Sequence, residues 1–599
     1  MTGDGRRVAG LGPWNPGLTS RMPAAVRPLS TIYRPDNVAT TIEQADERSQ
    51  FVGMDPEDLV VFRPERLVTH ELLIRITGDV SVPDGNRYAD LGINFRQIVD
   101  HILTAYIAPE MPAIVRAFDD LRTVLRSEAE TELRATLFAR ATGTAGRTGG
   151  GLLGRWFGRS ATSPRSPAPV DQRERQVVEQ WRKESLSGPD PQRRRLCRAL
   201  ANVVGSIRIR HGSVRGDVET LADLATDLAL NDHGSAVIGR MIEPIVRKAA
   251  EKEGYRLLPA QAEPVVMNVK GASAAGKSTL RPLQRKLAER LGIDWADFAL
   301  ISPDIWRKYL LDYESLGEHW RYAGMLTGDE LRIVDQKLDR YMAEKARRGA
   351  ISHLLIDRFR FDSFAEVEGG EQGARLLTRF GSEVYMFFVI TPPDATVERA
   401  WTRGLEFGRF KAVDDLLHHN VEAFCGMPDL FFTWATRRDK RVHYEFLDNS
   451  VSLGERPRTV AFGWNDEMTV LDVKCLLDVD RYQRIHIDAT CPDAVYPDAG
   501  QMAAANNTGF LRRCAKTIKT MRFADQDSGR VYARLEAGRL VWIDRPAFEV
   551  AIADDDTRAG MDALVPADLR ARTETADRAA FLERAQTRTL GRWGPAAER

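Results

Sequence analysis

Apolar runs alternate with helix-like segments between residues 262 and 455. The runs are VVMNV (265–269), FALIS (298–302), HLLID (353–357), VYMFFVI (384–390) and VHYEFL (442–447). Segments with the 3.6-residue period of a helix stand between them, as at 280–292 and 328–349. Repeated strand–helix units predict an α/β domain with a doubly wound parallel sheet. Because ligands bind beyond the carboxyl ends of such strands, the residues after each run are the candidates for a site.

The hydrophobic pattern changes on both sides of this region. Residues 67–82 (LVTHELLIRITGDVSV) alternate well enough to predict a strand, while residues 95–125 have helical periodicity broken at prolines. Helical patterns also fill residues 171–253. We therefore expect a mainly helical N-terminal region and a smaller α+β C-terminal region. Three downstream runs predict the strands of the latter: RIHIDAT (484–490), RVYARLEAGRLVWIDR (530–545) and FEVAIAD (548–554).

Local composition sets the boundaries between these parts. The first 42 residues are rich in Pro, Gly and Arg, and residues 141–170 are rich in Gly, Ser, Pro and Arg. Such segments have little to bury, so the first predicts disorder and the second a flexible linker. The expected order is a disordered N-terminus (1–42), a mixed, mainly helical domain (43–140), a flexible basic linker (141–170), a helical region (171–261), the doubly wound domain (262–455), an α+β domain (456–555) and a polar helical tail (556–599).

Composition and charge narrow the class of protein. The 599 residues carry 85 acidic and 85 basic side chains, so no global charge draws the chain to nucleic acid or to a membrane. Five scattered cysteines without a Cys-x-x-Cys pair indicate free thiols in a reducing compartment. The N-terminus has no apolar leader, and no apolar run approaches the roughly 18 residues of a membrane span. We expect a cytoplasmic protein without a membrane segment.

A local excess of positive charge surrounds the predicted linker. Residues 140–215 contain 16 Lys and Arg against 5 Asp and Glu, and Trp156 and Phe157 stand between arginines. Basic and aromatic side chains together can bind RNA, DNA or an anionic surface. A solvated, disordered segment has the same composition and is the favoured explanation. Nucleic acid is therefore a partner that the sequence allows but does not favour.

The turn after the first apolar run carries the strongest chemical signal. It reads GASAAGKST and fits the pattern G-x-x-x-x-G-K-[ST] at every fixed position, although a small-residue turn that binds nothing is the alternative. Small residues let backbone N–H groups point at phosphate oxygens, and the next helix adds the positive end of its dipole. Lys277 is predicted to reach the β- and γ-phosphates of ATP. The predicted nucleotide-binding residues of this loop are Gly271, Ala272, Ser273, Ala274, Ala275, Gly276, Lys277, Ser278 and Thr279.

Acidic residues follow the second and third apolar runs. Asp304 is predicted to be a general base for a hydroxyl that attacks the γ-phosphate, with a helix cap as the alternative. Asp357 closes the third run, where an acid can hold the hydration shell of Mg²⁺, with a turn residue as the alternative. Ser278 and Asp357 are thus the predicted Mg²⁺-binding residues. For Arg358 and Arg360, which follow Asp357, two interpretations remain: contact with an anionic substrate, or exposure to solvent.

Arginines after the fourth run predict a lid over the triphosphate. Arg399 and Arg403 stand four residues apart and share a helix face, and Arg409 follows a glycine. Arginines on a hinged segment can close over phosphates and stabilise the charge of the transition state. A solvated helix face is the ordinary explanation of this spacing, but Gly404 and Gly408 bracket the turn and favour a lid.

Asp448 and Asn449 follow the fifth run. A turn is the ordinary explanation of an Asp-Asn-Ser sequence. The position after a parallel strand also suits contacts to the base of a bound nucleotide. Both residues therefore join Arg399 among the predicted nucleotide-binding residues outside the loop.

In this order the features resemble the zeta-toxin group of P-loop kinases, which is itself similar to phage polynucleotide kinase and chloramphenicol phosphotransferase. The resemblance is confined to residues 262–455. Its elements are the loop at 271–279, the Asp-x-x-Arg of Asp304 and Arg307, the acid that closes the third run, the ER…R…GR segment at 398–409 and the DNS at 448–450.

The resemblance implies roles for individual residues. In this group the acid after the second strand is the base that activates the acceptor hydroxyl, which implies that role for Asp304. The lid arginines of the group contact ATP phosphates, which implies Arg403 and Arg409. The group often ends its third strand with Glu-Gly-Thr, whereas this chain has Asp-Arg-Phe at 357–359. The amino-sugar nucleotide substrate of the group is therefore not carried over.

The sequence thus predicts a P-loop kinase that moves the γ-phosphate of ATP to a hydroxyl of a small molecule with the help of Mg²⁺. A nucleotide or nucleotide-sugar is the favoured acceptor, and a toxin or effector role is open. The predicted catalytic residues are Asp304, Lys277, Arg403 and Arg409. Two alternatives remain: a polynucleotide kinase, for which the basic stretch would supply strand affinity, and an ATP-binding regulator without transfer activity.

Overall fold

The computed structural model describes residues 10–87, 89–138, 170–358, 377–452, 454–566, 568, 570, 580–583 and 588–595. The predicted linker at 141–170 lies outside these residues, apart from Val170. The chain forms two compact units. One comprises Met1–Leu29, Leu73–Asp100 and Ala249–Arg599, and the other comprises Ser30–Leu72 and His101–Lys248.

The smaller unit is helical in its described residues, as the sequence predicts for 95–125 and 171–253. Its helices are α1 (Ile42–Val52), α4 (Met111–Thr136), α5 (Val170–Ser187), α6 (Pro191–His211) and α7 (Val218–Ala229), and α2 (Pro64–Asp79), α3 (Asp90–Ile102) and α8 (Ser235–Glu253) belong partly to it and partly to the larger unit. The strand predicted at 67–82 is wrong, because these residues lie mainly in α2. Every residue from Leu67 to Gly78 is buried. A helix without an exposed face shows no 3.6-residue period of apolar and polar residues. In this helix the two kinds of residue alternate by chance, and alternation is the pattern that predicts a strand.

Ion pairs within the smaller unit neutralise much of the described part of the basic stretch. Arg193 of α6 lies 2.7 Å from Glu132 of α4 and 3.1 Å from Glu184 of α5. Such pairs join helices, and they reduce the charge that remains for a polyanion. Ion pairs of Arg193, Arg195, Arg198 and Arg208 join different helical segments in this way, whereas Arg175 and Arg182 pair with carboxylates within α5.

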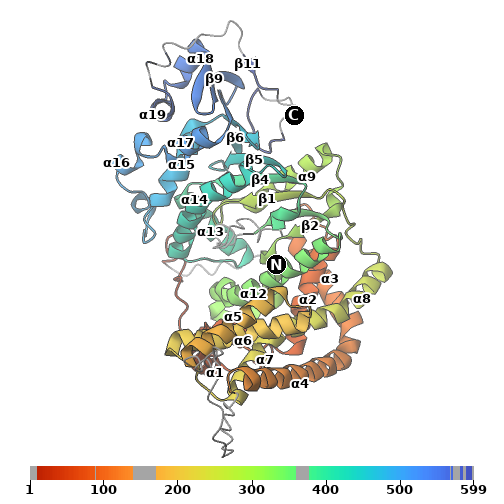
Figure 1. Cartoon of the computed structure of the whole chain (residues 1–599). Helices are drawn as coiled ribbons and strands as arrows, with labels where there is room; N and C mark the ends of the chain where they lie inside the picture. Colours follow the sequence, from red (N-terminus) through yellow and green to blue (C-terminus); the bar gives the residue numbers. More distant parts are fainter. Residues whose placement is uncertain are drawn as a thin grey trace, which may run out of the picture. The chain divides into compact units, whose positions relative to one another are not determined.

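The larger unit is built on one sheet that has eleven strands in the described part of the chain (Figure 1). The strand order is β10-β9-β8-β7-β6-β5-β4-β1-β3-β2, and β11 pairs with β9. The strands are β1 (Val265–Lys270), β2 (Phe298–Ile301), β3 (His353–Asp357), β4 (Glu383–Ile390), β5 (Arg441–Asp448), β6 (Arg458–Trp464), β7 (Glu467–Val470), β8 (Thr520–Ala524), β9 (Arg530–Glu536), β10 (Arg539–Ile543) and β11 (Ala580–Phe581).

The first five strands coincide with the five predicted runs, and the prediction of a parallel α/β arrangement is confirmed for them. β1 pairs in parallel with β3 and with β4, β2 pairs with β3, and β4 pairs with β5. Nearly all of their residues are buried, because a parallel sheet is covered on both faces. The chain runs from β1 to one side of the sheet and from β3 to the other side, so the carboxyl end of β1 lies where a ligand crevice forms.

Helices connect and cover these strands. They are α9 (Arg281–Arg290), α10 (Arg307–Leu310), α11 (Ala323–Leu326), α12 (Gly328–Arg347), α13 (Pro393–Phe407), α14 (Val413–Ala435), α15 (Val473–Arg481), α16 (Ala499–Met502), α17 (Gly509–Thr517), α18 (Arg545–Ala551) and α19 (Asp555–Leu564). The core between β4, β5 and α14 is aromatic. Phe388 stacks on Phe446 with ring centroids 4.8 Å apart, and Phe431 of α14 meets both rings edge-on.

The C-terminal region continues the same sheet, since β6 pairs with β5 in antiparallel orientation. The strands predicted within 530–545 are confirmed as β9 and β10, which form a hairpin. Two other predicted strands are wrong: residues 484–490 contain none, and most of residues 548–554 belong to helix α18 or the turn after it. Asp544 caps α18 by accepting a hydrogen bond from the backbone N–H of Ala547, and this cap overrides the β-branched residues that follow.

The C-terminal tail is only partly the polar helix that the sequence predicts. After α19, residues 580–581 form β11, and residues 589–593 pack against the sheet. Trp593 stacks on Phe462 of β6 with ring centroids 5.4 Å apart. The backbone N–H groups of Leu590 and Gly591 donate to the buried carboxylate of Glu445 on β5, at 2.6 and 2.9 Å.

Glu445 makes the stability of this contact dependent on pH. Its carboxylate also accepts a hydrogen bond from Thr459 Oγ1 at 2.7 Å. Burial raises the pKa of Glu445 from 4.5 to about 7, although the hydrogen bonds oppose the shift. In the unfolded chain the carboxyl group loses its proton at lower pH, so folding binds a proton between pH 4.5 and 7 and stability falls as the pH rises through this window.

We expect wild-type protein to lose about 3 kcal/mol of stability, relative to Glu445→Gln, between pH 5 and pH 8. The glutamine has no proton to lose, so the difference between the two proteins isolates the titration of Glu445. Denaturant unfolding of both proteins at several pH values measures it. Parallel pH profiles of the two proteins would contradict the assignment.

The N-terminal segment at 10–29 differs from the predicted disorder, because it packs on the rest of the larger unit. Leu18 lies in one apolar cluster with Phe410 and Ala412, and Val26 lies in another with residues of 311–326. Ser20 donates from its backbone N–H to Asp414 at 3.2 Å. A Pro- and Gly-rich composition predicts disorder only when apolar anchors are absent, and here two anchors are buried.

Among the residues that the structure describes, one helical stretch, Asp90–Thr136, meets the length and composition of a membrane span. Its most apolar 18-residue window has a mean hydropathy of 1.2, and 28 % of that window is buried. Scattered polar residues break the apolar run in this stretch, so the sequence alone predicts no membrane span there. Core helices of soluble proteins meet the same two criteria, and the cytoplasmic location stays a prediction.

Candidate functional site

The turn after β1 has the conformation of a tight loop that leads into a helix. Ala274 and Gly276 both have positive φ, at 62° and 93°, and reverse the chain before the 3₁₀ helix η7 (Lys277–Leu280). A Cβ atom on Gly276 would lie 2.2 Å from Asn449 Nδ2. Only glycine therefore fits at this point of the pattern, for both conformational and steric reasons.

Lys277 turns back over this loop. Its Nζ donates to the carbonyl oxygens of Gly271 and Ala272, at 3.0 and 2.7 Å. Burial lowers the pKa of Lys277 to about 8, although the nearby carboxylates of Asp357 and Asp304 oppose the shift. At neutral pH the ammonium group is therefore charged in the concave side of the loop, where an anion is stabilised.

Three polar side chains hold the loop in place. Asn449 Nδ2 and Thr391 Oγ1 both donate to the carbonyl oxygen of Ala275, at 2.7 and 3.0 Å. Arg399 donates to the carbonyl oxygens of Asn449 and Val451, at 2.7 and 3.0 Å. Arg399 and Asn449, both predicted to bind nucleotide, thus support the loop from behind. Thr391 at the end of β4 was missed, since a single threonine after a strand carries no signal in the sequence.

Asp448 is turned away from the loop, in contrast to its predicted role. Its carboxylate forms an ion pair with Arg458 of β6 and accepts a hydrogen bond from the backbone N–H of Ser450 at 2.8 Å. Its side chain is 5 % exposed. The carboxylate therefore joins β5 to β6, and of the two predicted residues only Asn449 lies against the phosphate loop.

Ser278 and Asp357 lie together, as their predicted role in Mg²⁺ binding requires. Ser278 Oγ donates to Asp357 Oδ2 at 2.6 Å, and Arg281 lies 3.7 Å from the same carboxylate oxygen. A hydroxyl and a carboxylate are hard oxygen ligands that suit Mg²⁺, which takes its other ligands from water and phosphate. The residues present fit this ion, and among the described residues no group of three or more His, Cys, Asp or Glu forms another candidate metal site.

Arg358 has a structural role that neither open alternative included. Its guanidinium is 4 % exposed and forms ion pairs with Asp335 and Asp339 of α12, the latter at 2.7 Å. The two carboxylates outweigh burial and raise the pKa of Arg358 above its ordinary value. Arg358 therefore anchors the end of β3 to α12, and Arg360 lies outside the described residues.

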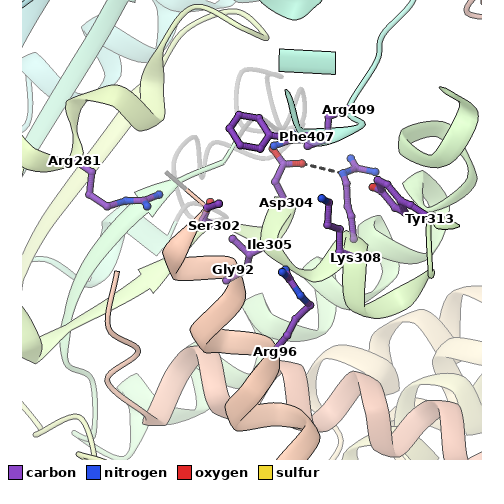
Figure 2. Close-up of a pocket in the computed structure, with 12 residues that line it drawn as sticks. Gly92, Arg96, Arg281, Ser302, Asp304, Ile305, Lys308, Tyr313, Phe407 and Arg409 are labelled. Atoms are coloured by element: carbon purple, nitrogen blue, oxygen red, sulfur yellow. Dashed lines mark hydrogen bonds and ion pairs between the residues drawn. The ribbon is translucent and has the colours of Figure 1, made fainter. Parts of the chain in front are cut away.

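Asp304 lies at the carboxyl end of β2, in the 3₁₀ helix η9 (Pro303–Trp306), and is held by two arginines (Figure 2). Arg307 Nε lies 2.9 Å from one carboxylate oxygen and Arg409 Nη2 lies 2.6 Å from the other. Desolvation alone would raise the pKa of Asp304, but Arg409 and Arg307 outweigh it and hold the pKa well below its ordinary value. Ser302 occupies the N-cap position and Asp304 lies in the first turn, so Asp304 is an acid at the N-terminus of this short helix, as the alternative interpretation proposed, although it is not the cap itself.

Arg307 fixes the orientation of Asp304. Its other nitrogen, Nη1, donates to the carbonyl oxygen of Gly324 at 2.6 Å and to Thr327 Oγ1 at 2.8 Å. The side chain is thus tied at both ends, and its guanidinium cannot follow an anion into the site. Asp304 remains 45 % exposed, so its carboxylate is accessible to a substrate.

The predicted lid is the end of α13 and the turn after it. Gly408 ends the helix with a positive φ of 74°, and a Cβ atom on Gly404 would lie 2.5 Å from the ring of Phe410, which folds back on the helix. This turn brings Arg409 to Asp304. Arg403 lies close enough to lower the pKa of Lys277, after the larger effects of burial and of the two carboxylates.

A pocket opens beside Asp304. α3 closes one wall of it with residues that precede the loop by nearly 200 positions, so nothing in the sequence connects them to the site. Figure 2 shows Arg96 of α3 pointing toward Lys308 and Asp304. The pocket is lined by Ala89, Gly92, Arg96, Arg281, Ser302, Asp304, Ile305, Arg307, Lys308, Tyr313, Phe407 and Arg409.

No protein-family model, no curated protein and no solved structure matches this chain. Function is therefore inferred from the site alone. Its described parts lie at the carboxyl ends of β1 to β5: the phosphate loop, Asp304 with its two arginines, Ser278 with Asp357, and Asn449 with Arg399.

Proposed function

We propose that the chain is a P-loop kinase that transfers the γ-phosphate of ATP to a hydroxyl group of a small molecule. The observation that carries this proposal is the position of Asp304. This ionised, partly exposed carboxylate interacts electrostatically with Lys277 of the phosphate-binding loop and also lines an open pocket. A protein that only binds ATP needs the loop but has no use for a base that faces a second substrate.

The residues of the loop would hold the triphosphate. Lys277 and the backbone N–H groups of 271–279 bind its oxygens, and Ser278 with Asp357 would hold Mg²⁺. When bound, Mg²⁺ neutralises charge on the β- and γ-phosphates. The acceptor oxygen bonds to the γ-phosphorus as the bond to the bridging oxygen of ADP breaks, and the hydroxyl proton passes to Asp304.

Arg409 has a double role in this proposal. In the structure it neutralises Asp304, which makes that carboxylate a weak base. The γ-phosphate carries more negative charge than one carboxylate and competes for the same guanidinium. Movement of Arg409 toward the phosphate raises the pKa of Asp304, while Arg307 keeps the carboxylate in place. The base is thus strengthened only when the phosphoryl donor is present.

The two alternative functions have less support. Ion pairs of α5 and α6 engage six of the eleven Lys and Arg side chains between residues 170 and 215, which reduces the charge available to a polynucleotide. A regulator without transfer activity would not need Asp304 and the cationic pocket beside it. The pocket instead favours a compact acceptor.

Asp304→Asn is expected to reduce phosphoryl transfer by roughly 10²-fold or more and to leave ATP binding nearly unchanged. The amide keeps the size of the side chain but cannot accept the proton. The rate of transfer from γ-labelled ATP to a pool of hydroxyl compounds measures the effect, and calorimetry measures ATP affinity. Asp312→Asn, at an exposed position of the next loop, is the matched control.

Two outcomes of this experiment would contradict the proposal. If Asp304→Asn transfers phosphate at the parent rate, the carboxylate is not the base. If the parent protein binds ATP but labels no compound, the chain is a nucleotide-dependent regulator.

A further inference from the structure

The pocket beside Asp304 has an excess of positive charge that the chain itself neutralises only in part. Five cationic side chains line it, against the single carboxylate of Asp304. Three of the five have a carboxylate partner: Arg307 and Arg409 share Asp304, and Arg281 lies near Asp357. The remaining two, Arg96 and Lys308, interact with carboxylates outside the pocket lining, Arg96 with Asp100 and Lys308 with Glu314, and Lys308 Nζ also lies 5.7 Å from the centre of the Tyr313 ring.

Arg96 and Lys308 are close enough to repel each other. Burial lowers the pKa of Lys308, and Arg96 and Arg409 lower it further. The Arg96 guanidinium folds over Gly92, whose missing side chain leaves room for it, since a Cβ atom there would lie 3.1 Å from Arg96 Nη1. Asp100 and Glu314 offset this repulsion only in part, since the pKa values of Arg96 and Lys308 stay below their ordinary values, and a bound anion would reduce the repulsion further.

The pocket also fixes where the anion lies relative to the base. Lys308 follows Asp304 by four positions across η9 and α10, so the two side chains are neighbours on one helical face. Neighbours of this kind have Cβ atoms roughly 5–6 Å apart. Asp304 and Lys308 therefore line one pocket, where the hydroxyl of a small molecule can face the carboxylate and its phosphate the ammonium group. Tyr313 and Ile305 supply flat and apolar surface beside it.

We propose that the acceptor itself carries a phosphate group, which Arg96 and Lys308 bind while the acceptor hydroxyl faces Asp304. This inference rests on the proposed kinase function and names its substrate class as phosphorylated hydroxyl compounds. Arg96 supplies a planar fork for two phosphate oxygens, and Lys308 supplies a point charge. Because Arg96 belongs to α3, a segment outside residues 262–455 determines the acceptor.

Matched pairs of acceptors test the inference. γ-Labelled ATP is offered with ribose or ribose 5-phosphate, and with uridine or uridine monophosphate. We expect the phosphorylated member of at least one pair to be labelled at least about 10-fold faster. An acceptor without the phosphate group leaves Arg96 and Lys308 without the anion that they would bind. Preference within the sugar pair or the nucleoside pair then distinguishes a sugar phosphate from a nucleotide. Equal labelling within both pairs, or labelling of a 5′-phosphorylated oligonucleotide alone, would overturn the inference.

Variants test the two binding residues. Arg96→Ala and Lys308→Ala are each expected to raise the KM for the phosphorylated acceptor by about 10-fold or more with little change in kcat, since the phosphate contact is equal in ground and transition states. Arg96→Lys should restore part of the affinity. Gln97→Ala, the next residue on α3 and an exposed one, is the matched control. A parental KM in both alanine variants would overturn the assignment.

A binding measurement separates this inference from the kinase proposal. Inorganic pyrophosphate is added to Lys277→Ala protein, in which the phosphate loop is disabled, and thermal unfolding is followed. The same measurement is made on the double variant Lys277→Ala/Arg96→Ala. If pyrophosphate raises the unfolding temperature of the single variant but not of the double variant, the anion site is supported. If it raises both, the anion site is contradicted. Transfer that depends on Lys277 but ignores the acceptor phosphate overturns the inference alone. Arg96-dependent stabilisation with no transfer to any compound overturns the kinase proposal.

Discussion

Lys277→Ala is expected to abolish both Mg²⁺–ATP binding and phosphoryl transfer in a protein that remains folded. The ammonium group lies over the loop, and its loss removes a direct charge partner of the β- and γ-phosphates. The loop itself should persist, because Asn449 and Thr391 still hold the carbonyl oxygen of Ala275. Calorimetric titration with ATP measures binding, and circular dichroism with thermal unfolding confirms the fold.

The pKa of Lys277 adds a second measurement to this prediction. Because burial lowers that pKa to about 8, the side chain of the free protein loses its charge within the range of ordinary buffers. ATP affinity of the parent should therefore fall as the pH rises from 7 to 9, by up to about tenfold per pH unit above 8. Lys277→Arg keeps its charge and should remove this dependence. Parental affinity in folded Lys277→Ala protein would show that the triphosphate binds elsewhere.

Arg409→Ala is expected to lower kcat by about 10³-fold while ATP affinity changes little. The guanidinium would act on charge that develops as the phosphoryl group moves, so its contribution is largest in the transition state. Single-turnover transfer from γ-labelled ATP separates the chemical step from product release. Glu406→Gln, at an exposed residue near the end of α13, is the matched control.

Arg409→Ala is also expected to change the pKa of Asp304, and in the direction that makes this carboxylate a stronger base. Without Arg409 the pKa of Asp304 should rise toward its ordinary value, although Arg307 still lowers it. The acid limb of the pH profile of kcat/KM, which reports groups of the free protein, should accordingly move to higher pH in Arg409→Ala than in the parent. An unchanged kcat together with an unchanged acid limb would show that this segment is a charged surface turn and not a lid.

Where the sequence succeeded, local pattern and tertiary environment agree. The five parallel strands are buried on both faces, so each is an uninterrupted apolar run with a turn behind it. The phosphate loop could be predicted from the sequence because both its backbone conformation and the close approach of Asn449 require glycine at position 276. Asp304 was placed correctly at a strand end because topology, and not distant packing, determines that position.

Where the sequence failed, distant contacts decide the outcome. α2 was taken for a strand because burial on all sides removes the helical period. Asp448 was assigned to the nucleotide because its partner, Arg458, comes from a strand that the sequence analysis did not recognise. The contribution of Arg96 to the pocket was invisible for the same reason: α3 reaches the site only through the fold, and no motif marks it.

The packing of residues 10–29 sets an order of events during synthesis. This segment leaves the ribosome well before its apolar partners, which lie at 311–326 and at Phe410 and Ala412. At about 5–20 residues per second, the partners emerge on the order of tens of seconds later. Until then Leu18 and Val26 lack the apolar side chains that cover them in the folded protein. The lid region is therefore completed only when residues 10–29 pack against these later segments. Limited proteolysis of stalled nascent chains should find the first residues cleavable until the chain extends beyond Asp414, and protected afterwards.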